Sequence, residues 1–168
     1  MNKSDECVSV RLYIVKGVNV MEKLSFDLGI REFRINNSDA YLRFNPSDPN
    51  VYNRFLKIPE KIEAIEHEMS EKVSKLQEND GAGALEALSR ADAKSKEVLN
   101  DVFELGNDFN QIMQGINIMA AGANGKRIII NLFEALLPIF EDGAQKCADA
   151  KLETAKANRE QRRAATRK

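Results

Sequence analysis

The sequence is short of the residues on which most catalysis depends. Its 168 residues include one histidine, two cysteines and no tryptophan. Cys7 and Cys147 stand in unrelated contexts, with no Cys-x-x-Cys pair and no Cys/His cluster, so the spacing predicts neither a zinc site nor a redox pair. The single His67 lies among glutamates on a polar helix face, which argues against a catalytic triad or a metal site. We therefore expect a protein that is not an enzyme and binds no cofactor or metal.

The chain also lacks a long hydrophobic run. Residues 8–20 are mildly apolar, but Arg11 and Lys16 interrupt them, and the stretch is too short for a membrane span or a secretory signal. A chain with two cysteines and no such signal is typical of a reducing compartment. We expect a cytoplasmic protein with no membrane partner.

The first twenty residues, 1–20, allow two interpretations. The stretch "VSVRLYIV" alternates well enough for an extra strand. Alternatively, codons for Lys16-Gly17-Val18 can spell a bacterial ribosome-binding sequence shortly before Met21, and translation then starts at Met21 instead of Met1. The nucleotide sequence of the gene decides between an upstream extension and a strand.

Residues 21–45 have the pattern of a small antiparallel sheet. Leu24, Phe26 and Leu28 alternate with polar residues, Gly29 offers a turn, and "REFRI" returns as a second strand. The turn residues "NNSD" precede a third run, "AYLRF". Because a lone hairpin is marginally stable in water, we expect a β-hairpin or three-stranded sheet packed on helices.

Residues 46–150 are predicted to form a helical bundle. Asp48 is a suitable N-cap and Pro49 suits the first helical position. Apolar residues then recur at spacings of three and four as far as Leu76, and Pro59 predicts a kink or break near Ile58. The fold class is therefore α+β, with a small N-terminal sheet beside about four helices.

Three further helices are expected after the loop "ENDGAGA". The first covers 85–105 and ends at Gly106, the second covers 107–115, and the third starts near residue 126. The last helix is apolar around most of its circumference at its start, which predicts a central position. Pro138 is expected to bend it.

The helical stripes contain more apolar surface than one small domain needs. A helix from Asp48 to Leu76 would be about 40 Å long and would overhang a small body. The middle of the next helix, residues 90–96, is polar or alanine and is expected to pack weakly or only against a partner. The candidate partner-binding residues in these two helices are Met69, Val73, Leu76, Leu85 and Leu88.

The final segment, 151–168, is basic. It holds seven Lys or Arg against two Glu, about +5, which leaves about −6 on the rest of a chain whose net charge is −1. We expect an exposed, frayed helix that serves as a solvated terminus, a docking segment for an acidic protein surface, or a nucleic-acid contact. Nucleic acid is the least favoured of the three, since the segment has no aromatic residue for stacking. Arg159, Arg162 and Arg163 are its candidate binding residues.

The order of these elements resembles a known group of proteins. The stretches "FNPSDPNVYNRF", "RADAKSKEVLNDVFELGNDFNQIM" and "NGKRIIINLFEALLPIFEDGAQK" are similar to short tail-module proteins of phages and prophages of Gram-positive bacteria, usually taken to be tail assembly chaperones. The most specific pieces are Phe44–Asp48 and Asn131–Leu136. The resemblance covers about residues 21–165, and the first twenty residues have no counterpart in those proteins.

The resemblance implies a non-enzymatic role in the cytoplasm of the host cell. Such chaperones coat the tape measure protein while tail tube subunits assemble around it, so both are the implied partners, and a homo-oligomer is compatible with this role. A frameshifted longer product exists in many phages. The family supplies no active-site residues. The alternatives are a structural component of the phage tail or virion, and a nucleic-acid-binding regulator that acts through the basic tail.

Overall fold

A two-stranded antiparallel sheet precedes the helices. The computed structural model describes residues 23–77 and 80–166. Strand β1 (Arg31–Arg34) pairs with β2 (Tyr41–Phe44), with Arg31 opposite Phe44. The turn between them is the predicted "NNSD", in which the Ser38 hydroxyl donates to the Ile35 carbonyl at 2.7 Å. The α+β class and the hairpin are thus confirmed.

The three-stranded alternative is wrong for the described residues. Leu24, Phe26 and Leu28 belong to no strand, and their side chains are exposed. Alternating apolar and polar residues show that a segment can form an edge strand of a sheet. The strand forms only where a neighbouring strand supplies the hydrogen bonds. The possible extra strand within residues 1–20 lies outside the described residues.

The predicted break near Ile58 separates two helices. Helix α1 (Pro49–Leu56) begins where the Asp48 side chain accepts the N–H of Asn50 at 2.8 Å, and Pro49 occupies its first turn. Helix α2 (Ile58–Ser74) starts after Lys57, with Pro59 in its own first turn, where the missing N–H costs nothing. The cap and the break are both confirmed.

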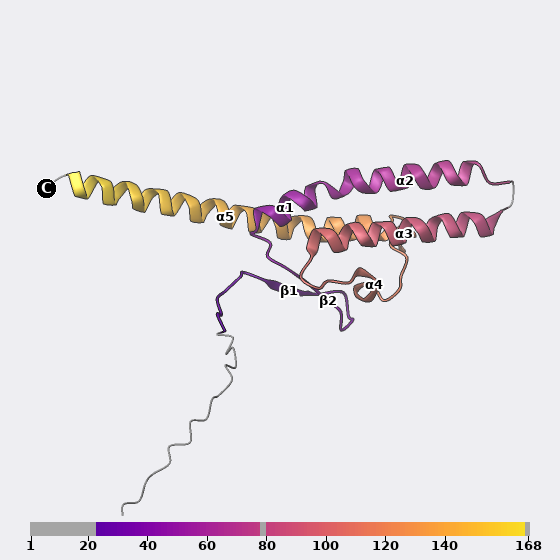
Figure 1. Cartoon of the computed structure of the whole chain (residues 1–168), viewed down its shortest axis with the longest axis horizontal. Helices are drawn as coiled ribbons and strands as arrows, with labels where there is room; N and C mark the ends of the chain where they lie inside the picture. The colour runs from indigo at the N-terminus through magenta and orange to yellow at the C-terminus, as the bar shows by residue number, and fades with distance from the viewer. Residues whose placement is uncertain (1–22, 78–79, 167–168) are drawn as a thin grey trace, which may run out of the picture.

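Helix α3 (Gly81–Phe103) packs antiparallel to α2 and is longer than expected at its start (Figure 1). Asp80 accepts the N–H of Gly83, so glycines assigned to a loop already lie in the first turn. The helix ends three residues before Gly106, because Glu104 and Leu105 already have positive φ.

The prediction that the middle of α3 packs weakly is wrong. Ala91, Ser95 and Lys96 are buried, and Ala91 belongs to the core cluster. Small side chains let a neighbouring element approach closely, and the lysine is neutralised by a carboxylate on its own helix.

The last two helices are α4 (Phe109–Ile112) and α5 (Ile128–Thr166). The Asp108 side chain accepts the N–H of Asn110 and caps α4, which is shorter than the predicted helix 107–115. Helix α5 has 39 residues and contains Pro138 without ending there. Figure 1 shows its C-terminal half extending beyond the rest of the molecule. The central position expected for its start is wrong in part, since Ile130 and Leu137 are more than 40% exposed.

The core is built on aromatic rings from the sheet and three helices. The ring of Phe44 on β2 lies 4.9 Å from Phe140 on α5 and 5.2 Å from Phe103 on α3, measured between centroids. Phe55 on α1 stacks on Phe140 at 4.2 Å. The sheet therefore rests on α3 and α5, and α1 closes the same core. No described helix combines the length and apolarity needed to cross a membrane.

Candidate protein-binding surfaces

Helices α2 and α3 form a long hairpin whose apolar side chains pack together, and one carboxylate bridges the two helices at the surface. Glu68 accepts hydrogen bonds from Lys72 on its own helix at 2.7 Å and from Lys94 on α3 at 2.5 Å. The hydrogen bond from Lys72, and then that from Lys94, lowers the pKa of Glu68 from 4.5 to about 2. The carboxylate is thus held charged at every pH at which the protein is expected to work.

The hairpin covers three of the five predicted partner-binding residues on its helices. Met69 and Leu88 are half-buried against the core. Leu76 is half-buried too, and its Cδ2 atom lies 2.9 Å from the point where a Cβ on Gly83 would stand, so it packs on the start of α3. Val73 and Leu85 face solvent, with 40% and 69% of their surfaces exposed.

A surface hollow of about 490 Å³ lies beside α2 near the start of α5. Its apolar part is Met69 and Val73, four residues apart on one helix face. Glu66 forms an ion pair with Arg127 across it, and His67 lies 3.9 Å from Glu71. The lining residues are Glu63, Glu66, His67, Met69, Ser70, Val73 and Arg127. An apolar strip with an acidic rim suits a helix that carries apolar and basic residues.

The predicted basic residues lie far from this hollow. Arg159, Arg162 and Arg163 are on the projecting half of α5, where every described side chain from residue 151 to 165 is exposed. Figure 1 places this half at the opposite end of the molecule from the tip of the α2–α3 hairpin. The structure therefore does not join the two sets of predicted residues into one site.

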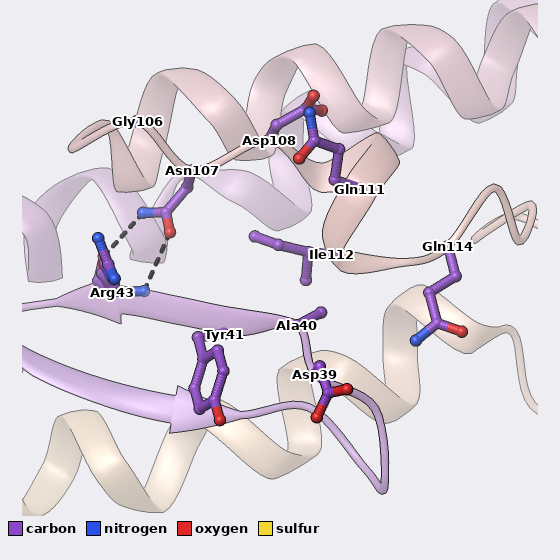
Figure 2. Close-up of a pocket in the computed structure, with 10 residues that line it drawn as sticks. All are labelled: Asp39, Ala40, Tyr41, Arg43, Gly106, Asn107, Asp108, Gln111, Ile112 and Gln114. Atoms are coloured by element: carbon purple, nitrogen blue, oxygen red, sulfur yellow. Dashed lines mark hydrogen bonds between the residues drawn. The ribbon is translucent and has the colours of Figure 1, made fainter.

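A second hollow, of about 580 Å³, separates β2 from the segment that carries α4 (Figure 2). Asn107 reaches across one end of it: its Oδ1 accepts the N–H of Arg43 at 3.0 Å, and its Nδ2 donates to the Arg43 carbonyl at 2.7 Å. The side-chain amide thus makes the two bonds that a neighbouring strand would make. Sequence reasoning missed this contact, since residues 43 and 107 are distant in the chain and share no pattern.

The buried polar cluster on α3 was also missed. The side chains of Lys96 and Asp92 are 3% and 14% exposed and lie 2.7 Å apart. The other oxygen of Asp92 accepts the N–H of Ile118 at 2.7 Å. The sequence signal for this pair was the spacing of four residues between Asp92 and Lys96, which places the two side chains on one face of a helix. The pair fixes the loop before α5 and is enclosed, so we assign it a structural role.

No family model, curated protein or solved structure matches the chain. Within the described ranges no three His, Cys, Asp or Glu side chains are grouped as a metal site would require. Cys147 is half-buried on α5, and Cys7 lies outside the described residues.

Proposed function

We propose that this protein is a non-enzymatic assembly chaperone of phage tails that binds the tape measure protein, and with it tail tube subunits. Two lines support the proposal. The resemblance of residues 21–165 to tail-module proteins suggests that the protein takes part in the assembly of phage tails. The partly exposed apolar strip on α2, formed by Met69 and Val73, suggests how the protein acts, by binding another polypeptide.

The hollow beside α2 is the observation that carries the proposal. Met69 and Val73 stand one helical turn apart and offer an apolar strip of about 6 Å, about as long as one turn of a docked helix. Glu63 and His67 lie along the same helix face, one turn apart. The occupant we infer is an amphipathic helix of the tape measure protein, with apolar residues toward Val73 and Lys or Arg toward the glutamates.

Weak binding at each hollow is sufficient for this role. A tape measure protein is long and helical, so many copies of the chaperone can bind along one client. Several modest contacts on a shared client raise the overall affinity without any new contact within a site. The apolar strip is small, with Val73 40% exposed and Met69 half-buried, and this fits a contact that must later be released.

The test is co-expression of the chain with a tape measure protein. We expect the wild-type chain to keep the client soluble and to co-purify with it, and Val73→Asp to lose both. Leu152→Asp is the matched control, because Leu152 is also an exposed aliphatic side chain but lies on the projecting half of α5. Equal loss in the two variants contradicts the proposed surface.

Mass spectrometry of purified particles separates the chaperone from a structural component. An assembly chaperone is absent from finished virions or present in traces. A stoichiometric amount of the chain in particles overturns the proposal in favour of a tail or virion component.

A further inference from the structure

An extended segment ahead of β1 leaves its apolar side chains in solvent. Residues Lys23–Leu28, here called the arm, form neither helix nor strand. Leu24, Phe26 and Leu28 are 85%, 68% and 55% exposed. In Figure 1 the arm turns away from the body ahead of β1. Burying a leucine or phenylalanine side chain lowers the free energy by several times the thermal energy. These three side chains therefore favour a state in which another surface covers them.

Two hydrogen bonds fix where the arm leaves the sheet. Gly29 has a φ of +66° and donates its N–H to the Asp27 carboxylate at 2.8 Å. Asn45 donates its side-chain N–H to the Leu28 carbonyl at 2.9 Å. The arm therefore leaves the sheet on the β1 side of the β1–β2 hairpin. To reach the free edge of β2 in its own molecule it must cross two strands, about 10 Å, which uses about three residues. Too little of the arm then remains to pair with that edge.

The edge of β2 that faces away from β1 can receive a strand at Tyr41, whereas at Arg43 the Asn107 side chain occupies it. The N–H and C=O of Arg43 point away from β1, since both bond to Asn107. Residues two apart in a strand point the same way, so the N–H and C=O of Tyr41 face the same hollow. Figure 2 shows Ile112 between this edge and the main chain of α4, as an apolar wall of the hollow.

We propose that the arm of one copy pairs in parallel with the β2 edge of a second copy. In this register Leu24 lies beside Ala40 and Phe26 beside Leu42, so the apolar row of the arm continues the face of β2 that packs on the helices. The backbone hydrogen bonds between the arm and β2 are made at Tyr41. At Arg43 the side chain of Asn107 already occupies the edge.

Charge selects the parallel direction. The parallel register sets Lys23 beside Asp39, a pair of opposite sign on the exposed face, while Arg43 keeps its bonds to Asn107 and its ion pair with Glu32. An antiparallel arm with the same face inward sets Asp27 beside Asp39, a pair of like sign. Like charges directly opposite each other destabilise a sheet, whereas opposite charges stabilise it.

Sedimentation equilibrium of the full-length chain alone tests the proposal. We expect reversible self-association, and the double variant Leu24→Ser/Phe26→Ser should raise the dissociation constant by at least about tenfold. Both side chains are exposed in the single molecule, so the variant retains the fold, which circular dichroism checks. Leu152→Ser is the matched control and should change nothing. A wild-type chain that stays monomeric overturns the proposal, and so does self-association that the double variant leaves unchanged.

A charge exchange tests the register. Lys23→Asp and Asp39→Lys should each weaken self-association, and the two together should restore it. Asp39 is 3.0 Å from Arg34 in its own chain but its side chain is almost fully exposed, so it remains accessible. Combined variants that are weaker than either single one exclude the parallel register. Because no client is present, a negative result here leaves the proposed binding to α2 standing, and failure of client binding leaves this proposal standing.

Discussion

The backbone of Gly143 on α5 touches the carbonyl group of Pro46, in the segment that follows β2. A Cβ built on Gly143 would stand 2.1 Å from the Pro46 carbonyl oxygen. This contact is where the long helix meets the chain between sheet and helices, and only a residue without a side chain allows it.

We predict that Gly143→Ala destabilises the protein by at least about 2 kcal/mol, because the backbone of Pro46 must move and the α5 contact is lost. Urea unfolding followed by circular dichroism measures this. Gly81→Ala is the control: nothing lies within 4 Å of its Cβ position in the first turn of α3. It should be neutral or stabilise by about 0.5 kcal/mol. Equal effects would show that the Pro46 contact is dispensable.

Removing one partner of the buried pair on α3 should be costly. Lys96→Met leaves the Asp92 carboxylate enclosed without its cation, and we expect a loss of about 3 kcal/mol in unfolding free energy. Adding Asp92→Asn should recover most of the loss, since the amide oxygen still accepts the Ile118 N–H. Lys146→Met breaks an exposed pair with Asp142 on α5 and should cost less than about 0.5 kcal/mol. A double variant no better than Lys96→Met contradicts this account.

The lowered pKa of Glu68 predicts acid sensitivity of the α2–α3 hairpin. The unfolded chain takes up the proton near pH 4.5, whereas the folded chain takes it up near pH 2. The stabilisation is therefore present in full above about pH 4.5 and is lost as the pH falls to about 2. Glu68→Gln should flatten the stability profile in that window, because it lowers the stability at neutral pH and changes it little near pH 2. Glu63→Gln on the same helix is the control, and an unchanged slope in Glu68→Gln would contradict the prediction.

Asn107 should control the exchange of one backbone amide. In Asn107→Ala the N–H of Arg43 loses its acceptor, and we expect its hydrogen exchange, followed by NMR, to become much faster. Asn107→Asp keeps the acceptor oxygen but loses the donor to the Arg43 carbonyl, so protection of the N–H should survive. The alanine variant should cost about 1–2 kcal/mol. Equal exchange in both variants would show that another group protects this amide.

The sequence contained the helix boundaries that depend on local chemistry. Asp48 and Pro59 act through hydrogen bonds or ring geometry within a few residues, so their positions alone predicted a cap and a break. The α+β class followed from the change in apolar period near residue 46.

The features that the sequence did not reveal depend on distant contacts. Leu24–Leu28 alternates like a strand but has no neighbour in its own molecule. Residues 90–96 look polar, yet Ser95 and Lys96 are buried because a carboxylate and a close neighbour compensate them. The Asn107 contact to β2 joins residues that no periodicity relates. For the candidate site, five apolar residues were predicted, and only the fold distinguishes exposed Val73 and Leu85 from the three that hold the hairpin.

The length of α5 governs how this molecule moves through solution. Its 39 residues span about 58 Å, and about 35 Å of that lies beyond Gly143. A globule of this chain length has a radius of gyration of about 15 Å, so the free half of the helix adds drag out of proportion to its mass. The protein should tumble anisotropically and elute from a sizing column ahead of its true mass. A mass obtained from elution volume alone would therefore mistake one extended molecule for two.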